Sequence, residues 1–205
     1  MSEELFYLNE LTRRLIKAVR LMDGTPETIA NIAEDLLPIV KETEKYSYEG
    51  TIAQGSLKND KNPIERRHSS PENFFPYSPA VGPLNPIAPP LKAEIFDGVK
   101  YKEVRATGLL DGAYVGPPNM VQGGVIALLF DDIMGTVLVA NDCGAMTGTL
   151  KVRYEAPTPI GVELLWVGKV DYFEGKKVFV KGELWVGDLL TASAEGIFIK
   201  VEMLQ

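Results

Sequence analysis

Two adjacent glycines, Gly123 and Gly124, stand immediately before a long apolar run that contains Asp131. Glycines let a backbone approach a ligand closely, and a helix that begins there directs unpaired N–H groups and its positive dipole end at whatever is bound. Such a position suits an oxyanion. The only polar side chains in residues 125–140 are Asp131, Asp132 and a threonine, so we expect a helix buried nearly all round. A carboxylate buried there needs a functional reason.

The segment around these glycines, residues 116–124 (GPPNMVQGG), resembles a known signature. It is similar to G-P-P-G-x-V-H-G-G, which hotdog-fold acyl-CoA thioesterases of the phenylacetyl-CoA thioesterase type carry before a helix. In that family an acidic residue follows nine positions after the histidine, and Asp131 stands nine positions after Gln122. Residues 147–157 resemble the family's next strand, including the Thr or Ser near the acid, here Thr147.

The resemblance, which covers about residues 80–201, implies an α+β hotdog fold with an antiparallel sheet wrapped around a long central helix. It implies an enzyme that hydrolyses an acyl-CoA thioester to the free acid and CoA. Asp131 would be the nucleophile or general base, and the Gly124 N–H would donate to the oxyanion. Gln122 and Thr147 would position the reacting groups. Further contacts with the substrate are expected from Asn119, Val121 and Gly123.

Two residues depart from the family signature, Gln122 in place of the histidine and Asn119 in place of a glycine. An amide donates and accepts hydrogen bonds much as a neutral imidazole does, but it carries no proton at physiological pH. A second interpretation therefore stays open, a non-catalytic acyl-CoA or aromatic-CoA binding protein of the same fold. A hydratase is poorly supported, because it needs an Asp…His pair and His68 is the only histidine.

Several of these residues also have a purely structural interpretation. Asn119 is of a type that caps helices, Gln122 can hydrogen-bond the next helical turn, and Thr147 suits a strand by propensity alone. Asp132 is rotated ~100° from Asp131 around a helix, so we expect it to make a structural hydrogen bond or to face solvent.

The spacing of Gly124 and Asp131 predicts the assembly. Seven residues are two helical turns, which puts both on nearly the same face and ~10.5 Å apart along the axis. One thioester carbon cannot touch both, because a base or nucleophile must lie within ~3 Å of the reacting atom. Two antiparallel copies of the helix would bring Gly124 of one chain against Asp131 of the other. We therefore expect a homodimer or a dimer of dimers.

Composition limits the other functions. The net charge of −7 argues against a nucleic-acid partner. With one cysteine, Cys143, and one histidine, the chain lacks the usual ligands of a zinc site and cannot form an internal disulfide. We expect no metal, no cofactor beyond the CoA of the substrate, and a cytoplasmic location. The apolar run at 125–140 is too short to span a membrane, so no membrane partner is expected.

The patterning divides the chain into three parts. Residues 1–46 predict a helical hairpin arm, because apolar residues recur at three- and four-residue steps. Residues 47–90 are rich in proline and predict an extended linker that lies on the body or on a partner subunit; polyproline binding by another protein is the runner-up. Residues 91–205 are expected to form the hotdog domain.

The expected helices and strands follow from the spacing of apolar residues and from the cap and turn residues between them. The arm should contain helices at 3–22 and about 26–45, the second with Thr25 as N-cap and a kink or break near Pro38. After the arm and linker, a period of two and an Asp97-Gly98 turn predict a hairpin. Strands are expected at 92–96, 99–109, 146–156, 161–173, 176–188 and 189–201.

Overall fold

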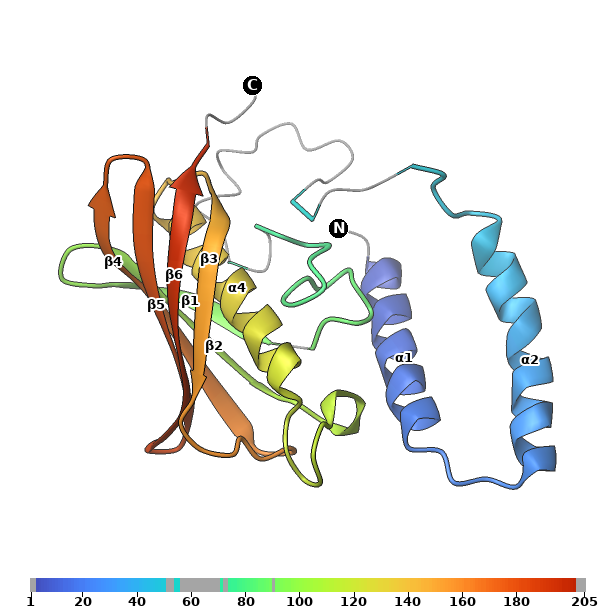
Figure 1. Ribbon diagram of the computed structural model, residues 1–205. Coiled ribbons are helices and arrows are strands. Elements are labelled where there is room, and N and C mark those ends of the chain that lie inside the picture. Colours follow the sequence, from blue (N-terminus) through green and yellow to red (C-terminus); the bar gives the residue numbers. More distant parts are fainter. Residues whose placement is uncertain (1–2, 51–53, 56–70, 72–73, 90, 202–205) are drawn as a thin grey trace.

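The computed structural model describes residues 3–50, 54–55, 71, 74–89 and 91–201. Two helices come first, followed by two strands, one long helix and four further strands (Figure 1). The predicted α+β architecture is confirmed: an antiparallel sheet wraps around a long helix, and a helical arm lies at the N-terminal end (Figure 1). His68 falls outside the described residues.

Six antiparallel strands form one sheet in the order β1-β2-β4-β5-β6-β3. Their bounds are β1 Lys92–Asp97, β2 Lys102–Leu109, β3 Ala145–Tyr154, β4 Glu163–Glu174, β5 Lys177–Val186 and β6 Leu189–Lys200. The last three strands follow one another through turns at Gly175 and Gly187, whose φ values of 56° and 55° suit glycine. Each predicted strand is therefore present, with its ends shifted by a few residues.

The β1–β2 hairpin forms, but its turn is longer than the predicted Asp97-Gly98 pair. Asp97 stays in the strand and pairs with Lys102, so the connection runs from Gly98 to Tyr101. A Cβ atom at Gly98 would lie 2.4 Å from the carbonyl oxygen of Tyr101. The glycine is needed there because two backbone segments approach closely, rather than because a two-residue turn requires it.

The long helix α4 (Gly123–Ala140) lies in the concave side of the sheet (Figure 1). Glycines in the strands beneath it let it come close: a Cβ at Gly168 would lie 2.7 Å from Val137, and one at Gly182 would lie 2.7 Å from Phe130. By length and composition alone α4 could cross a membrane, with a mean hydropathy of 1.8, but 56% of it is buried inside the fold. Its place in the core accounts for its apolar character.

The arm consists of α1 (Glu3–Arg20) and α2 (Pro26–Glu44). Thr25 is the N-cap of α2 as predicted, and its side-chain oxygen accepts from the Thr28 N–H. Of the kink or break predicted near Pro38, the break is wrong, because α2 is assigned as one helix through that residue, and the kink stays a prediction. None of the residues of α2 is buried, so water can satisfy the carbonyl that Pro38 leaves without a partner.

Residues 74–89 pack on the body without regular secondary structure, as expected for the part of the linker that the structure describes. Phe74, Ala80 and Val81 belong to the same hydrophobic core as α4 and the sheet. Arg13 of α1 holds this segment from outside, donating to the carbonyl oxygens of Ala88 at 2.9 Å and Pro83 at 2.8 Å. The segment therefore connects the arm to the central helix.

Candidate active site

The loop before α4 explains one departure from the family signature. Asn119 has a φ of 62°, in the left-handed region that glycine and, less often, asparagine adopt. Its carbonyl oxygen accepts from the Ile160 N–H at 3.1 Å. The suggestion that Asn119 caps the helix is wrong, since the N-cap of α4 is Gln122. Asparagine at 119 thus keeps the backbone conformation that a glycine would give.

Gln122 uses its side chain to cap α4, because its Oε1 accepts from the Val125 N–H at 2.9 Å. Tyr154 of β3 donates to the Gly123 carbonyl at 2.8 Å. Within the described residues, the amides of Gly123 and Gly124 donate no hydrogen bond, so this helix start keeps the free donors that an oxyanion needs. Any further contact of Gln122 with a substrate stays a prediction.

Val121, a predicted substrate contact, lies in a different environment from its neighbours. Its side chain is buried in the hydrophobic core. Its N–H donates to the Thr158 carbonyl at 2.9 Å, and the residue forms an isolated bridge with Val115. Val121 therefore has a structural role: it anchors the loop that precedes the glycine pair.

Asp131 and Thr147 meet as the sequence suggested. The Thr147 hydroxyl on β3 donates to Asp131 Oδ1 at 2.7 Å. Both residues line a cavity of about 390 Å³, together with apolar side chains such as Phe75, Val139 and Phe198. Asp131 is half-buried rather than enclosed in the core, because this side of α4 faces the cavity. A hydrogen-bonded carboxylate at an apolar cavity is a candidate nucleophile or general base.

Asp132 makes the structural hydrogen bond that its position on the helix suggested. The hydroxyl of Ser78 donates to Asp132 Oδ2, which ties residues 74–89 to α4. Burial raises the pKa of the Asp132 carboxyl to about 6, the bonds from Ser78 and the Val81 backbone lower it, and the charge of Asp131 raises it. This carboxyl is therefore held in a site that disfavours its charge.

Asp132→Asn is expected to change the pH dependence of stability. A folded-state pKa of about 6 exceeds the ~3.9 of an unfolded aspartate, so the folded chain binds more protons between these values and loses stability as pH rises through them. Asparagine can still accept from Ser78. The variant should gain on the order of 2 kcal/mol over the wild type at pH 7 and little at pH 4.

Thermal unfolding from pH 4 to pH 7 measures this difference. Asp142→Asn is the matched control, because Asp142 is exposed and has a positive φ of 54° that asparagine also tolerates. The control should follow the wild-type curve at every pH. If the stability of Asp132→Asn and that of the wild type changed with pH in the same way, the raised pKa of Asp132 would be contradicted.

A larger cavity, of about 770 Å³, lies elsewhere, between α1 and the short 3-10 helix η2 (Gly112–Tyr114). Two of its cationic groups are already engaged: Lys17 pairs with Asp111 at 3.1 Å, and Arg13 binds backbone carbonyls. Burial and the nearby Asp111 raise the pKa of Tyr114 to about 12, which leaves it protonated at neutral pH. We therefore place the candidate site at Asp131.

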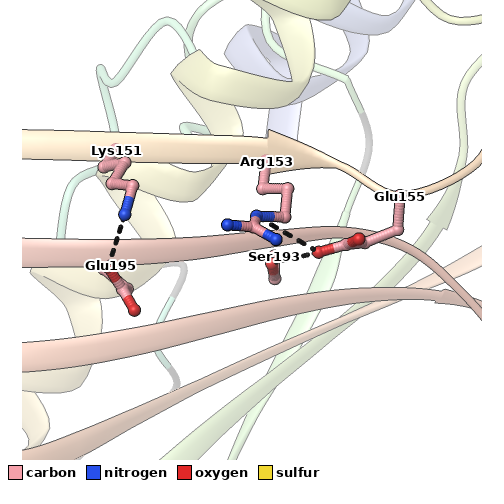
Figure 2. A network of polar contacts seen from close by, with 5 residues as sticks. All are labelled: Lys151, Arg153, Glu155, Ser193 and Glu195. Carbon is pink, nitrogen blue, oxygen red and sulfur yellow. Dashed lines mark hydrogen bonds and ion pairs between the residues drawn. The ribbon is translucent and has the colours of Figure 1, made fainter.

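A polar network on β3 and β6 marks the other face of the sheet (Figure 2). Lys151 lies 3.4 Å from Glu195, and Glu155 binds Arg153 and Ser193 (Figure 2). Alternating residues of β3 pack against the core, so these charged side chains point away from α4. Exposed pairs of this kind contribute little stability, and the network lies on the opposite face from the candidate site.

In the described part of the chain, no group of three or more His, Cys, Asp or Glu side chains could hold a metal ion. Cys143, the single cysteine, follows the end of α4, and its N–H donates to the Leu138 carbonyl at 2.9 Å. Burial raises the pKa of its thiol, which disfavours the reactive thiolate. The expectation of a metal-free site stays a prediction.

No protein-family model matches the chain. Acyl-coenzyme A thioesterase THEM4 of Xenopus laevis is 37% identical over 93 residues, which are 44% of this chain and 42% of that protein. The THEM4 of Mus musculus is 31% identical over 104 residues, or 49% of this chain and 45% of that protein. The chain therefore matches less than half of the length of these curated relatives.

A solved crystal structure of a thioesterase superfamily protein is similar over much more of the chain. The TM-score is 0.80 and the identity 28%, over 95% of this chain and 94% of that one. Because so little is left out, the match includes most of the helical arm as well as the sheet and the central helix. The chain belongs to the thioesterase superfamily and has its hotdog fold.

Proposed function

We propose that this protein hydrolyses an acyl-CoA thioester to the free acid and CoA. The observation that carries the proposal is the hydrogen bond from Thr147 to Asp131 at the edge of a cavity with an apolar lining. The similarity to curated acyl-coenzyme A thioesterases supports the same substrate class. A cytoplasmic location and the absence of a further cofactor stay expectations.

The geometry suggests how the groups would act. Thr147 holds Asp131 through Oδ1, and the second carboxylate oxygen is then available to attack the thioester carbon or to take a proton from an attacking water. The free N–H of Gly124 would donate to the oxygen that becomes negative as the carbonyl is attacked. CoA then leaves as the thiol once it has gained a proton. If water attacked, the acyl group leaves directly as the acid; if Asp131 attacked, water must then hydrolyse the anhydride between Asp131 and the acyl group, which releases the acid and restores the carboxylate.

The two parts of this site would come from two chains. The cavity beside Asp131 is not lined by Gln122, Gly123 or Gly124, consistent with ~10.5 Å between them along α4. β3, which carries Thr147, is an edge strand of the sheet, so a second copy could pair with it and bring its own α4 alongside. A homodimer, or a dimer of dimers, is therefore part of the proposal.

The second candidate function is binding of an acyl-CoA or aromatic-CoA without turnover. It is favoured by Gln122, which caps the helix and cannot carry a proton where the family has a histidine. The two functions differ in product formation, so the test is release of free thiol from a panel of acyl-CoA thioesters, with binding measured by calorimetry. We expect turnover of at least one thioester.

Gln122→His is expected to preserve or raise this turnover, because the imidazole restores the family's residue without enlarging the site much. Gln122→Ala serves as the comparison and should cost ~1 kcal/mol of stability through loss of the helix cap. If the wild type binds a thioester but neither it nor Gln122→His releases thiol, the binding-protein function replaces the enzyme.

A further inference from the structure

Half of the exposed large hydrophobic side chains in the described residues belong to the arm and the connection between its helices. Seven of them, together with the half-buried Leu36, form one row on each helix. The α1 stripe is Leu8, Leu11, Leu15 and Val19, and the α2 stripe is Ile29, Ile32, Leu36 and Val40. Both stripes repeat at steps of three, four and four residues, which is the apolar face of an amphipathic helix.

The α1 stripe is not the face by which α1 binds the body. That contact is made by Asn9, which is buried, and by Arg13, which binds carbonyls of residues 82–88. Leu8 and Leu15 lie ~100–160° around the helix from these two residues. Side chains of the α1 stripe remain 36–51% exposed. The body therefore leaves this row of leucines only partly covered.

The α2 stripe is equally uncovered. α2 lies on the far side of α1 from the sheet (Figure 1), and none of its residues is buried. Ile29, Ile32 and Val40 are 39–43% exposed. A helix of this length is marginal in water without tertiary packing, and an apolar patch on the order of several hundred Å² is typical of an interaction surface.

We propose that the arm of a second copy of this chain covers both stripes, so that two arms form an antiparallel four-helix bundle. Two hairpins with apolar rows of the same length and spacing can close such a bundle, with each row facing the shared core. This assignment does not depend on the proposed hydrolysis, because none of the arm residues named here lies at the Asp131 cavity.

Charge favours a second copy over other occupants. α2 is strongly acidic, with Glu27, Glu34, Asp35, Glu42 and Glu44 against Lys41. The second half of α1 is basic, with Arg13, Arg14, Lys17 and Arg20. A bundle of two arms places acidic α2 beside basic α1, whereas the acidic face of α2 would be repelled by an anionic membrane surface.

Cross-linking of the full chain tests the bundle. In a Cys143→Ser background, Ile32→Cys puts a single thiol on the α2 stripe, and Asn31→Cys puts one on the exposed polar face beside it. Helix axes in a bundle lie ~8–10 Å apart, so a short bismaleimide should join two copies at position 32. We expect several-fold more covalent dimer from Ile32→Cys than from Asn31→Cys on a denaturing gel.

Leu15→Glu, added to Ile32→Cys, should reduce the cross-linked fraction about tenfold or more, because it puts a charge into the bundle core. Glu10→Gln is the matched change away from the stripe and should leave cross-linking as it was. Circular dichroism of each variant checks that the helices and sheet persist.

Equal cross-linking at 31 and 32, or none at 32 in a chain that sediments as a dimer, would overturn the proposal. So would a chain that stays monomeric at every concentration. Binding of the wild type to phosphatidylcholine–phosphatidylserine vesicles, without cross-linking at 32, would assign the stripes to a membrane instead.

Discussion

Asp131→Asn is expected to reduce the turnover of an acyl-CoA thioester by ~10²–10⁴-fold, the usual effect of removing a positioned acid or base. Asparagine keeps the shape of the side chain, and its Oδ1 can still accept from the Thr147 hydroxyl. It can neither attack the thioester carbon nor take a proton from water. Binding of the acyl-CoA, measured by calorimetry, should therefore stay intact or become tighter.

The neighbouring carboxylate supplies the control for this prediction. Asp132→Asn makes the same chemical change one residue along α4, where the carboxyl is bound by Ser78. Its turnover should stay within a few-fold of the wild type. If Asp131→Asn keeps wild-type turnover while Asp132→Asn loses it, the acid of the proposed mechanism is Asp132.

The order of elements could be predicted from the sequence because local signals indicate it, whereas the pairing of Asp131 with Thr147 was implied by the resemblance to the thioesterase family. A change from helical to alternating period locates the arm and the sheet, and glycine marks the turns between the last strands. The signature around Gly123 and Gly124 then fixed where the central helix begins. These signals each lie within a few residues along the chain.

Contacts that depend on distant segments could not be predicted in the same way. Ser78 and Asp132 are 54 positions apart, and Ser78 stands in a proline-rich stretch with no periodicity to place it. The hydrogen bonds from Arg13 to carbonyl oxygens of residues 82–88 also join residues that are far apart in the sequence. The backbone conformation of Asn119 was missed, because asparagine tolerates a positive φ but only the surrounding loop requires it there.

The helix cap shows a different kind of miss. Glutamine is not among the residues most favoured as N-caps, so Asn119 is the first candidate by residue type. In the structure the loop between Gly116 and Met120 is closed by its own backbone hydrogen bonds, which leaves Gln122 as the last residue before the helix. The residue that caps α4 is thus determined by the position at which the loop ends.

A mixture of two inactive variants is expected to recover activity, which tests whether the site is shared between chains. Gly124→Pro removes the N–H proposed to bind the oxyanion, and proline is tolerated in the first turn of a helix. A Cβ at Gly124 would meet only the flexible end of the Gln122 side chain, at 2.9 Å. Each Gly124→Pro homodimer then lacks both donors, and each Asp131→Asn homodimer lacks both acids.

In a mixed dimer of these two variants, one site combines the intact Gly124 of one chain with the intact Asp131 of the other, and the second site has lost both. Random exchange of equal amounts makes half of the dimers mixed, so thiol release should return to about a quarter of the wild-type rate. The measurement compares the mixture, after subunits have exchanged through mild denaturant, with each variant alone treated in the same way. If both groups belonged to one chain's site, every site in the mixture would lack one of them, and activity would stay at the level of the separate variants.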